Sequence, residues 1–147
     1  MEREIRTLDG LQTKANDLVA RLTPQEAGAT LITLSGELGA GKTAFASALA
    51  KALGVEDAVT SPTFVLEKIY ALSKENGRGF ARLAHIDAYR LKEGSELAAL
   101  GFDELMRDPR TLVVLEWPER VADALPQTAH MLTLIAREDG SRTIMYG

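Results

Sequence analysis

The sequence contains no cysteine, which excludes a disulfide framework and any metal site built from thiolates. No apolar run approaches the length of a membrane-spanning helix, and the opening MEREIRTLDG lacks the apolar core of a signal peptide. Basic residues are not in excess, and a net charge of −4 argues against a surface that grips nucleic acid unaided. We therefore expect a cytoplasmic protein with no membrane association.

What the chain does contain is ordinary globular composition. It has 147 residues, of which 46% are hydrophobic and 26% charged, and this suits one domain with a real core. Residues 11–22 place apolar side chains at helical spacing, with charged and polar ones on the other side. We predict a single domain over residues 1–147, with an amphipathic helix near its start.

A glycine-rich motif follows this helix. The apolar run Leu31–Leu34 predicts a short buried strand, and Ala44–Leu53 has no helix breaker before Gly54. Between them the sequence fits G-x-x-x-x-G-K-[ST] at every fixed position. The motif comprises Gly36, Glu37, Leu38, Gly39, Ala40, Gly41, Lys42 and Thr43. A strand, a glycine loop and a helix in this order predict a phosphate-binding loop (P-loop).

The chemistry of phosphate binding explains this spacing. Glycines let the backbone turn tightly and point its N–H groups inward, and the helix that starts near Lys42 adds the positive end of its dipole. Lys42 is placed to reach the β- and γ-phosphates, and the hydroxyl of Thr43 to bind Mg²⁺. The motif therefore predicts binding of a nucleotide together with Mg²⁺.

The rest of the chain predicts more strands and two short helices. An antiparallel hairpin is expected around Asn76-Gly77, a buried parallel strand before Glu116, and two closing strands at the end. The predicted strands are 64–70, 80–86, 111–115, 131–136 and 142–146, and the short helices are 96–100 and 102–106. We expect an α/β P-loop NTPase fold with a mixed, mostly parallel central sheet flanked by helices.

Two acidic residues at predicted strand ends are candidate catalytic and metal-binding groups. Glu116 ends an apolar strand, which is the Walker-B arrangement with Glu in place of the usual Asp. Asp87 follows another strand and could bind Mg²⁺ directly, bind it through water or position the attacking water. His85 alternates with Asp87 on one strand face, where a lone histidine is more often structural or hydrogen-bonded than catalytic.

Two further features lie near these acids in the predicted fold. The hydroxyl-rich loop with Ser61 and Thr63 occupies the place where GTPases carry the switch that senses the γ-phosphate. Trp117, the only tryptophan, adjoins Glu116 and is a candidate reporter of nucleotide binding. The sequence has no N-K-x-D guanine motif, so ATP is the expected nucleotide.

Four motifs in this order resemble one family closely: the bacterial TsaE (YjeE) P-loop ATPases of tRNA threonylcarbamoyladenosine biosynthesis. Besides the P-loop, the resemblance rests on Ser61-Pro62-Thr63-Phe64, on His85-Ile86-Asp87-Ala88-Tyr89-Arg90-Leu91 and on Glu116-Trp117-Pro118-Glu119. It covers nearly the whole chain. Ala44 and Ala88 depart from the family pattern, in which a hydroxyl residue and Leu are common at these positions.

The resemblance implies ATP, Mg²⁺ and slow intrinsic hydrolysis. It also implies a complex with the TsaD and TsaB proteins that modifies the adenosine beside the tRNA anticodon, in which ATP hydrolysis resets the complex and tRNA is contacted only indirectly. Its implied site residues are Thr43 and Glu116 as Mg²⁺ ligands, Asp87 for hydrolysis, Ser61 and Thr63 as switch residues, Trp117 beside the acid, and Thr13 near the adenine.

Two other functions remain open from the residues alone. One is a small-molecule P-loop kinase, although the arginines are scattered and form no Arg-rich lid segment. The other is a regulatory module that binds a nucleotide and barely hydrolyses it.

Overall fold

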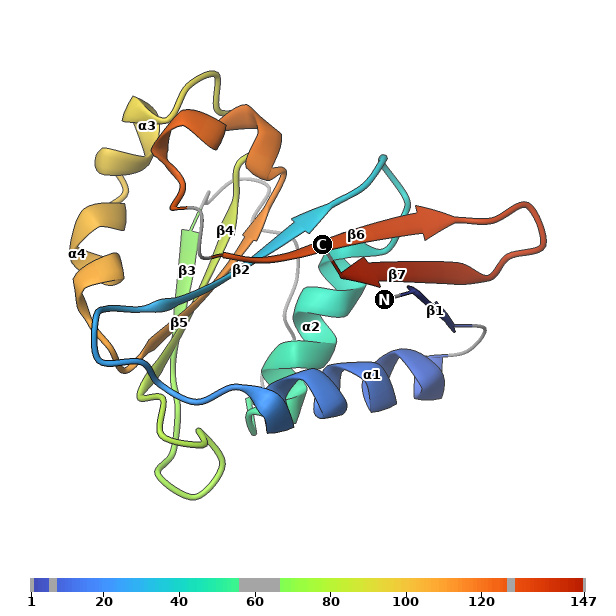
Figure 1. Ribbon diagram of the computed structural model, residues 1–147, viewed down its shortest axis with the longest axis horizontal. Coiled ribbons are helices and arrows are strands. Elements are labelled where there is room, and N and C mark those ends of the chain that lie inside the picture. Colours follow the sequence, from blue (N-terminus) through green and yellow to red (C-terminus); the bar gives the residue numbers. More distant parts are fainter. Residues whose placement is uncertain (1, 6–7, 56–66, 127–128, 147) are drawn as a thin grey trace.

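The structure, a computed structural model, describes residues 2–5, 8–55, 67–126 and 129–146 (Figure 1). Its centre is a seven-stranded sheet in the order β1-β7-β6-β2-β5-β4-β3. The strands are β1 (Glu2–Ile5), β2 (Thr30–Ser35), β3 (Glu67–Ala71), β4 (Arg82–Asp87), β5 (Thr111–Glu116), β6 (His130–Ala136) and β7 (Arg142–Tyr146). The helices are α1 (Leu8–Arg21), α2 (Lys42–Ala52), α3 (Ser95–Ala98) and α4 (Phe102–Arg107), with 3-10 turns η1 (Pro118–Arg120) and η2 (Ala122–Ala124).

The sheet is parallel at its centre and antiparallel at both edges. β2 pairs in parallel with β5 and with β6, and β5 pairs in parallel with β4. β3 is antiparallel to β4, β7 is antiparallel to β6, and β1 is antiparallel to β7. Most strands therefore point in one direction, and the predicted mixed, mostly parallel α/β sheet is confirmed, including the hairpin of β3 and β4.

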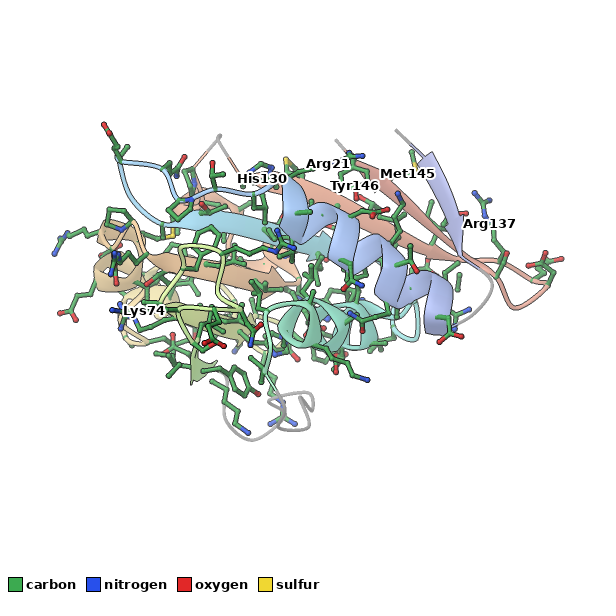
Figure 2. The ribbon with its side chains drawn as sticks, turned by 90° about the horizontal axis from the view of Figure 1, so that it is seen from below. Arg21, Lys74, His130, Arg137, Met145 and Tyr146 are labelled. Carbon is green, nitrogen blue, oxygen red and sulfur yellow. The ribbon has the colours of Figure 1, made fainter. Side chains whose placement is uncertain are left out.

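Helices cover both faces of this sheet. In Figure 1, α1 and α2 lie on one side and α3 and α4 on the other, and Figure 2 shows α1 and α2 side by side in the turned view. Alternate residues of β2 serve the two cores: Ile32 and Leu34 pack towards α1 and α2, whereas Leu31 packs towards α3 and α4. Burial on both faces explains why the central strands read as continuous apolar runs.

The predicted N-terminal helix is confirmed as α1, which starts three residues earlier than its apolar pattern. It packs against α2, and the side-chain amide of Gln12 donates to the carbonyl oxygen of Ala48 at 2.9 Å. The sequence did not predict β1, which has three charged residues among four and pairs along the edge of the sheet with β7. Among the described helices, none combines the length and the apolar character needed to cross a membrane.

Candidate nucleotide-binding site

The glycine loop leaves the carboxyl end of β2 and enters the N-terminus of α2. Gly36, Gly39 and Gly41 have φ angles of 144°, 81° and 100°, which side chains on an L-residue rarely permit. Gly41 caps α2, and its carbonyl oxygen accepts the Phe45 N–H at 2.9 Å. The motif's three glycines therefore stand where the backbone requires glycine, and this turn brings the loop to the carboxyl end of the parallel strands.

Gly36 is also required by a close approach to β6. A Cβ atom at this position would lie 2.5 Å from the carbonyl oxygen of Leu134, whereas one at Gly39 would meet no atom within 4 Å. We expect Gly39→Ala to lower the free energy of unfolding by about 1–2 kcal/mol through backbone strain alone. Gly36→Ala adds the steric clash, for a loss of about 2–4 kcal/mol. Urea unfolding of the two variants checks this order, and equal losses would contradict the close approach.

Lys42 begins α2 and folds back over the loop. Its Nζ atom donates hydrogen bonds to the carbonyl oxygens of Gly36 and, at 2.8 Å, of Glu37, and it lies 4.0 Å from the ring centroid of Trp117. Burial lowers the pKa of Lys42, and the carboxylates of Glu116, Glu119 and Asp87 oppose that shift. The loop thus holds a largely desolvated ammonium group that is hydrogen-bonded to two uncharged carbonyl oxygens.

Glu116 and Thr43 meet beside this loop. The Thr43 hydroxyl donates to Oε1 of Glu116 at 3.0 Å, and the Glu116 residue is only 2% exposed. Asp87 is the register partner of Glu116 on the neighbouring parallel strand, so the two side chains share the sheet face that α2 covers. Oδ1 of Asp87 accepts the Tyr89 N–H at 3.0 Å. The structure therefore gathers Thr43, Glu116 and Asp87 at one end of the sheet.

His85 contacts Glu116 from the other side. Nε2 of His85 lies 2.5 Å from Oε2 of Glu116, and both side chains are 2% exposed. The sequence interpretation of His85 as structural or hydrogen-bonded agrees with this contact, although it did not name Glu116 as the partner. The sequence signal for this contact was the alternation of His85 with Asp87, which places both side chains on the same face of β4. His85 lies two residues before Asp87, next to the two acids.

Aromatic side chains form one wall of the site. Trp117 adopts a left-handed backbone conformation with φ 61°, and its ring centroid lies 4.9 Å from that of Tyr89. The guanidinium carbon of Arg120 lies 5.3 Å from the Tyr89 ring centroid. A cavity of about 490 Å³ opens among these three side chains, Ser35, Gly36, Glu37, Leu38 and Glu119. Tyr89, Glu119 and Arg120 were not among the sequence candidates for the site.

The remaining candidates fall in different places. Ser61 and Thr63 lie outside the described residues. Thr13 is on the exposed face of α1, where its hydroxyl donates to the carbonyl oxygen of Asp9 at 2.9 Å. Leu38 is 73% exposed at the tip of the loop, while Ala40 is buried.

Comparison with known proteins matches this chain to one family. The family model described as "Threonylcarbamoyl adenosine biosynthesis protein TsaE" matches residues 6–144. A protein of Treponema pallidum named "tRNA threonylcarbamoyladenosine biosynthesis protein TsaE" is 36% identical over 115 residues, which are 78% of this chain and 79% of that protein. A protein of the same name from Bacillus subtilis is 35% identical over 142 residues, which are 96% of this chain and 82% of that protein.

The fold is similar to a solved structure as well. The crystal structure of YdiB from Bacillus subtilis superposes with a TM-score of 0.78 at 25% sequence identity, over 99% of this chain and 83% of that one. The sequence match over most of the chain, together with this shared fold, shows that the protein belongs to the TsaE family of tRNA threonylcarbamoyladenosine biosynthesis.

Proposed function

We propose that this protein is a Mg²⁺-dependent ATPase of tRNA threonylcarbamoyladenosine biosynthesis that acts with TsaD and TsaB. The observation that carries the proposal is the joining of two parts at one end of the sheet. One part is the glycine loop with Lys42, and the other is the hydrogen-bonded pair of Thr43 and Glu116. The family's name supports the pathway, and the geometry supports binding of a nucleotide and a metal ion.

The phosphate-binding part uses the loop and the start of α2. Backbone N–H groups of the loop and the N-terminus of an 11-residue helix attract anions without any side chain. Lys42 adds a full positive charge at the point where the loop enters the helix. Because its present partners are uncharged carbonyl oxygens, exchanging them for phosphate oxygens gains charge-assisted hydrogen bonds.

The donor set beside the loop fits Mg²⁺. This ion prefers oxygen ligands and, in nucleotide sites, takes one or two from the protein and the others from phosphates and water. The hydroxyl of Thr43 and the carboxylate of Glu116 are such ligands and already lie 3.0 Å apart. No cluster of three or more His, Cys, Asp or Glu at metal-binding spacing occurs in the described ranges. When bound, Mg²⁺ neutralises phosphate charge, and Asp87 is placed to orient water.

The partners follow from the family rather than from a surface of this chain. A net charge of −4 fits a subunit that reaches tRNA through TsaD and TsaB instead of binding it alone. ATP is proposed over GTP because the chain has no N-K-x-D motif. Thr13 is the proposed contact near the adenine, and Ser61 and Thr63 are the proposed switch residues. In this proposal hydrolysis resets the complex between rounds of modification.

We expect ATP affinity to begin to fall at a lower pH than it would if Lys42 had the pKa of an ordinary lysine. Burial places the pKa of Lys42 below its usual 10.5 in the free protein. Bound phosphates raise that pKa, because an opposite charge favours the ammonium form. Between the two pKa values the complex holds more protons than the free protein, so affinity declines as the pH rises through this interval.

Calorimetry in buffers of different ionisation enthalpy measures this proton uptake. Lys42→Arg is the matched control, because a guanidinium stays protonated throughout. Affinity of the unmodified protein that is constant over the same alkaline range would contradict the linkage.

An assay of the purified chain tests the proposed function. ATP turnover is measured with and without Mg²⁺, and with and without TsaD, TsaB and tRNA. We expect weak, Mg²⁺-dependent hydrolysis that changes when the partners are added. Phosphate transfer to a small acceptor without partners would favour a kinase, and binding with no turnover under any condition would favour a regulatory module.

A further inference from the structure

Three buried or half-buried side chains form a hydrogen-bonded series at the site. Nε2 of His85 contacts Oε2 of Glu116 at 2.5 Å, and Oε1 of Glu116 accepts the hydroxyl hydrogen of Thr43 at 3.0 Å. His85 comes from β4, Glu116 from β5 and Thr43 from α2, so the series joins two strands to the start of the helix. Each oxygen of the carboxylate therefore has one donor, and the carboxylate plane is fixed by both.

A glutamate at this position needs such an anchor more than an aspartate does. Where the Walker-B acid is an aspartate, the carboxylate lies one methylene closer to the backbone and has one torsion fewer. Glu116 carries the extra torsion, and the rotamer freedom of a longer side chain opposes any single placement. The contact with His85 holds Oε2 of Glu116 and leaves Oε1 directed towards Thr43.

Filling the core does not explain the histidine. Nδ1 of His85 is buried and has no hydrogen-bond partner within the part of the chain that the structure describes. A buried polar atom without a partner costs free energy, so an apolar side chain would fill this space at less cost. The tautomer with its hydrogen on Nε2 leaves only a lone pair unpaired on Nδ1 and donates to the carboxylate. Within the described residues, Glu116 is thus the only hydrogen-bond partner of the His85 imidazole.

We propose that His85 is a positioning residue for the metal-binding pair, acting on Thr43 through Glu116. With its Oε2 held by His85, Glu116 keeps Oε1 as the acceptor for the Thr43 hydroxyl, and the lone pairs of that hydroxyl stay free for a cation. The inference rests on the proposed function, because it names the residue that orients the proposed Mg²⁺ ligands. Partners behind metal ligands set ligand orientation in this way, and their loss typically weakens metal binding about 10- to 100-fold.

The test is the Mg²⁺ concentration that half-saturates the increase in ATP affinity, measured by calorimetry so that no turnover is needed. We expect His85→Leu to raise this concentration about 10- to 100-fold while ATP affinity in EDTA stays unchanged. His85→Gln, whose amide nitrogen can replace Nε2 as donor, should lie closer to the unmodified protein than to the leucine variant. His130→Leu is the matched control, because the other histidine of the chain is exposed on β6 (Figure 2) and should change neither value.

A double-mutant cycle separates positioning from general damage. In a Glu116→Ala background, His85→Leu should raise the Mg²⁺ requirement no further, because the carboxylate through which His85 acts on Thr43 is gone. Thermal unfolding identifies a variant that fails to fold. If His85→Leu fails to fold, the Mg²⁺ requirement of His85→Gln is compared with that of the unmodified protein instead. An unchanged Mg²⁺ requirement in His85→Leu, or equal effects of His85→Leu with and without Glu116, overturns the inference alone. ATP binding by the unmodified protein that does not respond to Mg²⁺ overturns the proposed function and the inference with it.

Discussion

Lys42→Ala is expected to weaken ATP binding about 10²- to 10⁴-fold. Hydrogen bonds to charged groups contribute about 1.5–3 kcal/mol each, and Lys42 holds two acceptors of the loop that phosphate oxygens would replace. Losing two such bonds costs about 3–6 kcal/mol of binding free energy, which corresponds to that range of dissociation constants. Calorimetric titration with ATP and Mg²⁺ measures the change directly.

The loss should be specific to binding. Lys42 is 5% exposed, and removing a buried ammonium also removes its desolvation penalty, so we expect little change in the free energy of unfolding. Lys51→Ala is the matched control, since Lys51 lies in the last turn of the same helix and is exposed. Undiminished ATP affinity in Lys42→Ala would show that the loop does not hold a triphosphate in the proposed way.

The parts of the fold that the sequence predicted are those with local signals. β2, the loop and α2 follow from an apolar run, three glycines and an uninterrupted helix pattern, and Gly54, the predicted helix breaker, follows the C-cap Leu53 with φ 83°. β1 carried no such signal, because an edge strand paired on one side needs no apolar run. The 3-10 turns after Trp117 were also missed, since runs this short leave no periodicity to detect.

The candidate site residues that the sequence indicated lie within the P-loop motif or at the end of a predicted strand. Lys42, Thr43 and Glu116 were identified by spacing and by strand ends, and the structure brings Thr43 and Glu116 into contact. The contact between His85 and Glu116 depends on which strands are neighbours and in what register, and a single sequence does not contain that register. The contact between the Lys42 ammonium group and the Trp117 ring likewise depends on the left-handed backbone of Trp117, which no local sequence pattern indicated.

Lys42 also contacts the aromatic wall of the site. The ammonium group is attracted to the face of the Trp117 ring, and the Tyr89 ring packs against the same tryptophan. In the proposed function, a movement of Lys42 towards a phosphate would change the charge next to the indole, and Tyr89 follows Asp87 by two residues in the chain. The groups proposed for phosphate binding and for hydrolysis are therefore joined through one aromatic pair as well as through the sheet.

Asp87→Asn is expected to leave ATP affinity nearly unchanged and to lower turnover about 10²- to 10⁴-fold, the range typical of a group that accepts or directs a proton in the reaction. Asparagine keeps the oxygen that accepts the Tyr89 N–H, so the turn after β4 should persist while the carboxylate charge is lost. Single-turnover hydrolysis separates this effect from product release, and calorimetry reports the affinity. Asp103→Asn, on the exposed first turn of α4, controls for the loss of one negative charge. Hydrolysis at the unmodified rate in Asp87→Asn would remove Asp87 from the reaction, whereas a parallel loss of ATP affinity would assign it to binding instead.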